Sequence, residues 1–289
     1  MPRIARYAPK GLIYHALNRA VARLPLFQKE ADYEAFERVV HEAHEKFPVE
    51  ILAYCVMPNH WHFVLRPTKD GQLTAFLRCV AHTHTMRWHA HYHTSGTGHL
   101  YQGRFKAFPV EDDDHFYTVV RYVERNALRA GLVAQAQAWR WSSLWRHVSG
   151  DAETRALLAR WPLPRPRGWV EYVNAPQTDA ELESLRRAVR RSSPFGNTDW
   201  QQTIAKRLGL QSSLRDRPRP GHHDPVLLEP VRRQNLVGLL APALEAAHCR
   251  SSAAFVFGLE RNHVGPFALL GAVRVDLPID LADAEVLAD

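Results

Sequence analysis

The sequence predicts an α+β fold, a ferredoxin-like mixed or antiparallel sheet with flanking helices, within about the first 150 residues. The main observation is the order of its segments, in which strand-like and helix-like stretches follow one another as β, α, β, β, α, β, α. The second observation is Met-Pro-Asn, a turn sequence between two adjacent strand-like runs that favours a hairpin. The third is composition: 46% of the 289 residues are hydrophobic, enough for a large buried core. A small, helical and basic C-terminal region is expected to follow.

The predicted elements of the core have local causes. In chain order, we expect a strand at 10–18, a helix at 29–47, strands at 49–56 and 60–65, a helix at 71–91, a strand at 104–110 and a helix from 112 to about 131. Apolar residues recur at helical spacing in the helices, and Pro48 ends the first of them. The acidic run from Asp112 to Asp114 suits a helix N-terminus, because the helix dipole favours negative charge there.

The rest of the chain divides by composition. After the first domain (1–150) we expect a Pro-rich connection at 151–177, a basic helical segment at 178–220 and a tail of unknown role at 221–289. Two short helices are predicted inside the basic segment, at 178–191 and 198–208. The second would begin at a cap, Asn197 or Thr198, and end at Gly209.

Charge is unevenly distributed along the chain. The net charge is +7 and the sequence pI is about 9.5, which only weakly favours a nucleic-acid partner. Residues 186–219 hold nine Lys or Arg and two Asp, whereas the chain after Gly221 is net acidic. A DNA-binding surface and an ordinary solvated charge run both remain open interpretations of this block.

The chain has no pattern of a secretory signal, and no stretch approaches the roughly 18 apolar residues of a membrane span. We therefore expect a cytoplasmic protein. Its cysteines, Cys55, Cys79 and Cys249, form no C-x-x-C pair, so neither a disulfide framework nor a cysteine zinc site is indicated.

Two histidines suggest a metal site. His60 and His62 lie two apart in a strand-like run, so their imidazoles point to one side of the strand and Trp61 points to the other. Three other histidine pairs share this spacing but lie in or near a helical stretch, where residues two apart cannot reach one ion. Spacing alone leaves open that the His60 and His62 pair arises by chance.

A second pattern lies on the last predicted helix of the core. Tyr122 and Asn126 are four residues apart and therefore share one helix face. A tyrosine that attacks phosphorus and an amide oxygen that completes a His-His-Asn metal shell would need this arrangement. An ordinary tyrosine of an amphipathic helix is the alternative, and a single sequence does not exclude it.

Several longer motifs resemble one known family. They are MPNHWHFVL (57–65), GHLYQGRFKAF (98–108), RYVERNALRAGLV (121–133), WSS (141–143) and NR (18–19). Together they resemble the REP-associated tyrosine transposases, a branch of the single-tyrosine HUH transposases in the IS200-like superfamily. Residues 186–210 and the SLR at 213–215 are similar to the C-terminal segment of that branch. Ala127 departs from the family, which usually has proline there, and 221–289 resemble nothing in it.

The resemblance implies a fold, an activity and a site. Residues 1–150 would be an HUH nuclease core, with Tyr122 as the nucleophile and His60, His62 and Asn126 as ligands of Mg²⁺ or Mn²⁺. The activity would be a metal-dependent endonuclease and strand transferase, a transposase that cuts single-stranded DNA through a 5′-phosphotyrosine intermediate. Its partners would be REP-type palindromic hairpins with adjoining single-stranded DNA. A bacterial protein that is a monomer or homodimer, and that associates with the nucleoid when bound to DNA, is also implied.

Basic residues near the motifs and in the basic segment are expected to bind DNA. They are Arg19, Arg104, Lys106, Arg121, Arg125, Arg129, Arg186, Arg187, Arg190, Arg191, Lys206 and Arg207. Arg121, Arg125 and Arg129 recur every four residues, which favours a track for phosphates on one helix face. Tyr101, Phe105 and Trp141 are candidates for stacking on unpaired bases, although core packing is the alternative for each.

Two other functions remain open at this point. One is a hairpin-binding regulator that keeps the fold without cutting, for which loss of a site residue would be the sign. The other is a relaxase or rolling-circle initiator-like nickase with the same chemistry.

Overall fold

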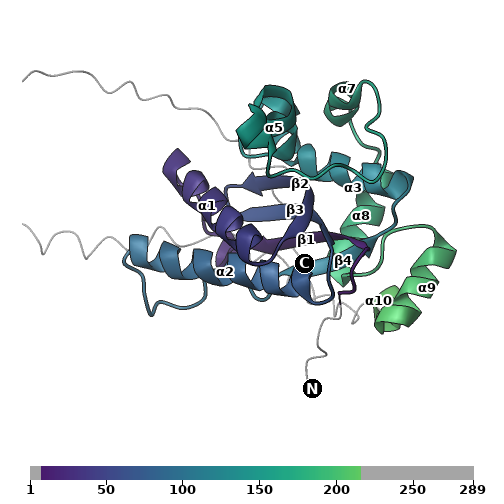
Figure 1. Cartoon of the computed structure of the whole chain (residues 1–289), viewed down its shortest axis with the longest axis horizontal. Coiled ribbons are helices and arrows are strands. Elements are labelled where there is room, and N and C mark those ends of the chain that lie inside the picture. Colours follow the sequence, from purple (N-terminus) through teal and green to yellow (C-terminus); the bar gives the residue numbers. More distant parts are fainter. Residues whose placement is uncertain (1–7, 216–289) are drawn as a thin grey trace, which may run out of the picture. The chain divides into compact units, whose positions relative to one another are not determined.

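The computed structural model describes residues 8–215, and its centre is a four-stranded sheet (Figure 1). The strands are β1 (Ile13–Arg19), β2 (Val49–Met57), β3 (His60–Pro67) and β4 (Lys106–Val110). Their order is β2-β3-β1-β4, and every neighbouring pair is antiparallel. With α1 (Glu30–Lys46) after β1 and α2 (Gln72–His91) after β3, this is the ferredoxin-like order. The predicted α+β fold is confirmed.

Helices α1 and α2 cover one face of the sheet (Figure 1). Phe36 and Val40 of α1 and Phe76 and Leu77 of α2 pack there in a cluster that also holds Trp61 of β3. Phe36 and Val40 are four residues apart, and Phe76 and Leu77 lie three and four residues after Leu73 of the same cluster, so each set shares one side of its helix, as the periodicity predicts. The β2–β3 hairpin turns at Pro58 and Asn59.

The other face of the sheet carries α3 (Asp114–Glu124) and most of the later elements. The later elements that add buried residues to the cluster on this face are α4 (Asn126–Arg129), the 3-10 turn η2 (Ala136–Ala138), α5 (Ser143–Ser149), α7 (Trp169–Asn174) and α8 (Asp179–Arg191). The other described elements are the 3-10 turn η1 (Val21–Arg23), which directly follows β1, and the helices α6 (Ala152–Arg155), α9 (Thr198–Leu208) and α10 (Gln211–Leu214). Asp113 caps α3 by accepting a hydrogen bond from the backbone N–H of His115. Phe116, Val119 and Val123 of α3 are buried against this face.

The helix expected from 112 to about 131 is divided in two at Arg125. Helix α3 ends at Glu124 and α4 begins at Asn126, and Arg125 lies between them with φ −82° and ψ −7°. The two parts are still joined by hydrogen bonds, because the N–H of Arg129 donates to the carbonyl of Arg125. The prediction of one continuous helix was therefore wrong in detail.

The C-terminal helices were predicted closely. Thr178 and Asn197 cap α8 and α9, and Gly209 ends α9 with φ +68°, a left-handed conformation that glycine adopts without a Cβ clash. Helix α8 buries Leu185 and Val189 in the same cluster as α3, so residues 8–215 form one compact unit. Residues 216–220 of the basic segment and the tail at 221–289 lie outside the described residues. Among the described helices, none is long and apolar enough to cross a membrane.

Candidate active site

The site lies on the sheet face that α3 covers, and strand register places its residues. His60 pairs with Arg19 of β1, and His62 pairs with Leu17. Leu17 in turn pairs with Lys106 of β4. Directly opposed residues of an antiparallel ladder project to the same face, so these side chains share the face of the two histidines. Trp61, between the histidines, packs in the cluster on the other face, as the period-two alternation predicts.

Both histidines are buried and leave the same nitrogen open. Nδ1 of His60 donates to Oδ1 of Asn59 at 2.6 Å, and Nδ1 of His62 is hydrogen-bonded to Nε2 of His15 at 2.9 Å. In each ring Nε2 is therefore the nitrogen left for a ligand. The rings are 5.0 Å apart between centroids and nearly perpendicular. A hydrogen bond on one ring nitrogen that orients the other is the usual arrangement of metal-binding histidines.

The protonation state of these imidazoles also suits a metal. Burial lowers the pKa of His60 to about 3, with smaller contributions from the positive charges of Arg19 and Arg129. Burial also lowers the pKa of His62 well below its ordinary value. Both rings are neutral at pH 7, and a neutral imidazole is the form that binds a metal ion.

His15 belongs to the site, although sequence reasoning did not single it out. Its ring stacks on His62 with centroids 5.1 Å apart, and it meets Tyr122 edge-on at 6.1 Å. Burial lowers its pKa to about 3, and its Nδ1 is buried without a hydrogen-bond partner. When His62 binds a ligand through Nε2, its Nδ1–H donates to Nε2 of His15. The available signal was its place in a predicted strand, but only the register of β1 with β3 connects it to His62.

Tyr122 of α3 and Asn126 of α4 reach the site from the helices that cover this face of the sheet. Tyr122 is 1% exposed, and its ring meets that of His62 edge-on with centroids 5.9 Å apart. Asn126, buried at the start of α4, accepts a hydrogen bond at Oδ1 from Nη2 of Arg129. The Arg129 guanidinium also lies 4.3 Å above the centre of the Tyr122 ring. Nδ2 of Asn126 and Nη1 of Arg129 are buried without partners.

The donor set at the site fits a divalent metal ion. Two neutral imidazoles and an amide oxygen suit Mn²⁺ and leave coordination positions for a phosphate oxygen, and Mg²⁺ accepts the amide oxygen readily. Buried polar atoms without partners lie on His15, which is hydrogen-bonded to His62, and on Asn126 and Arg129, which are hydrogen-bonded to each other. Such atoms are uncommon in a folded protein and mark a place where a further group would be bound.

The structure divides the basic residues expected near the site. Arg19 and Lys106 lie on the histidine face of the sheet, and Arg129 covers Tyr122. Arg121 and Arg125 point elsewhere: Arg121 donates to the carbonyls of Ala175 and Pro176, and Arg125 donates to those of residues 173 and 174. The three arginines of the expected phosphate track thus do not present their guanidinium groups side by side. Arg104 is exposed before β4.

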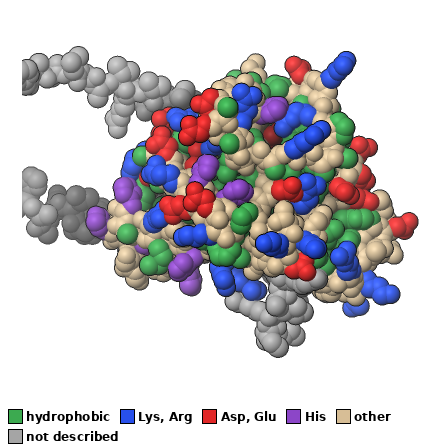
Figure 2. All heavy atoms as spheres, in the orientation of Figure 1, with side chains coloured by type: hydrophobic (Ala, Val, Ile, Leu, Met, Phe, Trp, Pro, Cys, Tyr) green, Lys and Arg blue, Asp and Glu red, His purple; other side chains and the backbone are tan. Residues whose placement is uncertain are grey.

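The basic residues of α8 and α9 differ in exposure. Arg187, Arg190, Lys206 and Arg207 are exposed, whereas Arg186 and Arg191 are partly buried. Arg190 forms an ion pair with Glu183. On the face of the molecule drawn in Figure 2, Lys and Arg side chains alternate with acidic ones and form no continuous band. The predicted stacking residues Tyr101, Phe105 and Trp141 are buried in the cluster under α1 and α2.

A second group of possible metal ligands was not foreseen. Ligand atoms of Glu111, Asp113 and His115 lie within 4.8 Å of one another. Each already has a partner, however, because Glu111 accepts hydrogen bonds from Asn197 and Asp113 accepts them from His115. This group joins β4, α3 and the start of α9.

The part of the chain that holds these residues is similar to a known family. Residues 9–126 match the family model described as transposase IS200 like. This part of the chain is a domain of the IS200-like transposase family. The match runs from just before β1 to Asn126, so it includes His60, His62 and Tyr122 as well.

Solved structures give only a distant likeness to this transposase. One is described as the structure of the REP-associated tyrosine transposase bound to a REP hairpin, at 22% identity and a TM-score of 0.44, covering 52% of this chain and 86% of that one. Another is described as a transposase of Deinococcus radiodurans, at 18% identity and a TM-score of 0.31, covering 43% and 96%. No curated protein matches the chain.

Proposed function

We propose that this transposase is a metal-dependent enzyme that nicks single-stranded DNA and transfers the strand, with Tyr122 as its nucleophile. His60, His62 and Asn126 would hold Mg²⁺ or Mn²⁺. The observation that carries the proposal is the meeting of the two histidines, each with Nε2 open, and Tyr122 on one face of the sheet. Nothing in the fold requires two buried imidazoles with open nitrogens at this place.

The chemistry follows from the residue types. A bound Mg²⁺ or Mn²⁺ would neutralise charge on the phosphodiester, which otherwise repels a nucleophile. Oη of Tyr122 attacks phosphorus, the bond from phosphorus to the 3′ oxygen breaks, and that oxygen leaves as a 3′-hydroxyl after gaining a proton. The phenol loses its own proton in the same step. The new 5′-phosphotyrosine bond keeps the energy of the broken one, so a second 3′-hydroxyl can reverse the step without ATP.

Arg129 has a defined part in this scheme. It covers the ring of Tyr122 and occupies Oδ1 of Asn126, the atom expected to face the metal. Because Nη1 of Arg129 is buried without a partner, it can bind a phosphate oxygen that arrives beside the tyrosine. Cutting requires Arg129 to release Asn126, and the charge of the incoming phosphate favours this exchange.

A REP-type hairpin is the proposed substrate, and this part of the proposal depends on the sequence motifs. The runs at 57–65, 98–108 and 121–133 resemble the REP-associated branch, and the basic residues of α8 and α9 resemble its C-terminal segment. We expect these helices to contact the hairpin mainly through its backbone. Whether the protein acts as a monomer or a homodimer stays a prediction.

The alternative functions differ from this one in measurable ways. A regulator without cutting activity is disfavoured because all four site residues are present and three of the side chains meet at the site. A relaxase or rolling-circle initiator-like nickase would share the covalent step, so only the choice of DNA separates it. Hairpin and unstructured oligonucleotides should therefore be compared.

The test is formation of a covalent adduct. The full chain is incubated with Mn²⁺ and a labelled hairpin oligonucleotide that carries single-stranded flanks, and adducts that resist denaturation are counted. Tyr122→Phe should abolish the adduct and leave hairpin binding intact, because only the phenol oxygen is removed. Tyr117→Phe is the matched control, since Tyr117 lies on the same helix and its hydroxyl donates to the carbonyl of Pro164. An undiminished adduct in the Tyr122 variant would overturn the assignment.

A further inference from the structure

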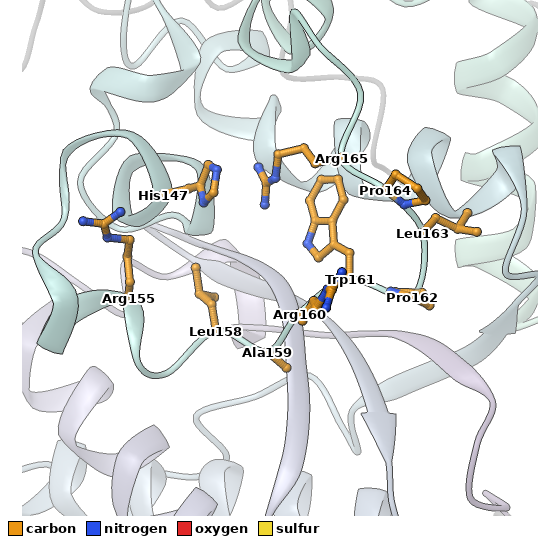
Figure 3. Close-up of a pocket in the computed structure, with 10 residues that line it drawn as sticks. All are labelled: His147, Arg155, Leu158, Ala159, Arg160, Trp161, Pro162, Leu163, Pro164 and Arg165. Carbon is orange, nitrogen blue, oxygen red and sulfur yellow. The ribbon is translucent and has the colours of Figure 1, made fainter.

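A basic pocket of about 610 Å³ opens beside the Pro-rich segment that follows α6 (Figure 3). Its walls include His147 of α5, Arg155 of α6, and Arg160, Trp161 and Arg165 of the connection at 151–177. In Figure 3 His147 lies between Arg155 and Arg165, and the guanidinium group of Arg165 points toward it. None of the ten lining residues is acidic.

The connection is fixed in place, so the pocket has firm walls. The N–H of Ala159 donates to the carbonyl of Ile51, and Nε1 of Trp161 donates to the carbonyl of Leu52. Both acceptors belong to β2 at the edge of the sheet. Trp161 is buried in the same cluster as α3, which places the pocket on the sheet face that holds His60 and His62.

Arg165 is held in the pocket by Trp161, and one nitrogen of its guanidinium has no hydrogen-bond partner. Its guanidinium lies 3.7 Å above the centre of the Trp161 ring, a close cation–π contact. Its Nη1 is buried and has no hydrogen-bond partner. The buried carboxylate of Glu124 acts on it through charge, but that carboxylate accepts its hydrogen bonds from Ser143 and Trp169. An unpaired guanidinium N–H in a fixed position favours an anionic oxygen.

The pocket is also electrostatically positive. The pKa of His147 is lowered by burial and then by the positive charges of Arg165 and Arg155, so both guanidinium groups act on the space between them. Asp151, whose carboxylate caps α6 by accepting from the N–H of Thr154 at 2.7 Å, is not among the lining residues. The lining itself therefore carries positive charge and no negative charge.

We infer that this pocket binds backbone phosphates of the DNA, as a contact separate from the cutting site and from the basic helices α8 and α9. The inference rests on the proposed function only in taking DNA as the substrate. Guanidinium groups with open N–H donors are the usual ligands of phosphate oxygens. The Pro-rich segment would then be a DNA-binding element as well as a connection.

The position of the pocket indicates which phosphates it would bind. Ile51 and Leu52, which anchor the connection, lie five to six residues along β2 from Met57, the partner of His60. At roughly 3.4 Å per residue that is about 20 Å along the strand. This distance suits the flanking hairpin stem more than the cleaved bond itself.

The salt dependence of DNA binding tests the inference. The double variant Arg155→Gln/Arg160→Gln changes two exposed side chains, and it is titrated with the labelled hairpin at several salt concentrations. If each arginine contacts one phosphate, the slope of log K against log salt should fall by about 1.4 to 1.8. The matched control is Arg38→Gln/Arg78→Gln, which removes the same charge from exposed positions of α1 and α2, on the other side of the sheet. The control should change the slope by much less.

Three further measurements decide between the outcomes. Arg165→Gln, checked for an intact fold by thermal unfolding, should also lower the slope. Equal slopes in the double variant and its control would overturn the inference. A second result would also overturn it. If pyrophosphate stabilises the parent but not the double variant, and the two have the same DNA slope, the pocket binds a free anion and not DNA. The covalent adduct at saturating DNA should persist in the double variant. A missing adduct in the parent would mean that the proposed function has failed, whereas an unchanged slope would mean that only this inference has failed.

Discussion

Both faces of the sheet bury histidine, but the hydrogen bonding of the buried polar groups differs between them. On the face covered by α1 and α2, Nδ1 of His84 is hydrogen-bonded to the hydroxyl of Tyr101 at 2.6 Å, and that hydroxyl also accepts from Nε1 of Trp61. On the α3 face, His15, Asn126 and Arg129 each have a buried polar atom without a partner. Helix α2 has one such atom, on His89, which is not part of the core cluster.

This difference separates structural polar groups from functional ones. A buried polar group without a partner costs about 1 to 3 kcal/mol, so the α3 face carries a cost that the core cluster of the other face avoids. A fold tolerates this cost where a bound ligand supplies the missing hydrogen-bond partner. The α3 face is also where the imidazoles and the tyrosine meet. The α1 and α2 face shows that this chain can satisfy a buried histidine when packing is its only role.

The largest expected effect is on metal binding. His60→Ala or His62→Ala should abolish Mn²⁺ binding measured by calorimetry, and with it the covalent adduct, because each removes one of two imidazole ligands. EDTA should do the same to the parent protein. His84→Phe, which removes the imidazole of the other face, should leave Mn²⁺ binding unchanged. If the three variants bound Mn²⁺ alike, the contrast between the faces would have no functional meaning.

A smaller effect is expected at His15. His15→Ala removes the hydrogen bond that orients His62, and losing such a partner typically weakens metal affinity by about 10- to 100-fold. Mn²⁺ affinity by calorimetry and the electron paramagnetic resonance signal of bound Mn²⁺ report this without reference to cutting. His15→Gln should recover part of the affinity, since its amide oxygen can accept from Nδ1 of His62. Unchanged affinity in His15→Ala would show that the histidine only fills space.

The smallest effect concerns acid stability and the other face. Burial lowers the pKa of His84 to about 3, below the value near 6.5 of the unfolded chain. The stability that comes from keeping it neutral is therefore present above pH 6.5 and is lost as the pH falls from 6.5 toward 3. Between pH 6.5 and 5.5 this loss amounts to about 1 kcal/mol.

His84→Phe should remove that share of the pH dependence. Urea unfolding at the two pH values, in the presence of EDTA, measures the difference in unfolding free energy. The parent should lose about 1 kcal/mol more than the variant over this interval. An identical loss in both proteins would mean that His84 is as accessible to protons in the folded state as in the unfolded one.

Local sequence was sufficient for most of the elements of the sheet domain, for α8 and α9, and for one half of the site. Period-two alternation placed His60 and His62 on one face and Trp61 on the other, because successive side chains of a strand always project to opposite faces of the sheet. The caps at Thr178 and Asn197 and the stop at Gly209 were readable for a similar reason, since they depend on neighbours four residues away or fewer. The order of elements restricted the sheet to few topologies.

Tertiary contacts decided the rest. The register of β1 against β3 brought His15 and Arg19 to the histidines, and no local rule specifies how two strands 40 residues apart align. Equal spacing suggested one role for Arg121, Arg125 and Arg129, but the carbonyls of residues 173–176 engage the first two and leave Arg129 over Tyr122. Spacing along a helix tells which residues share a face, whereas the partner of each side chain depends on what the chain later packs against that face.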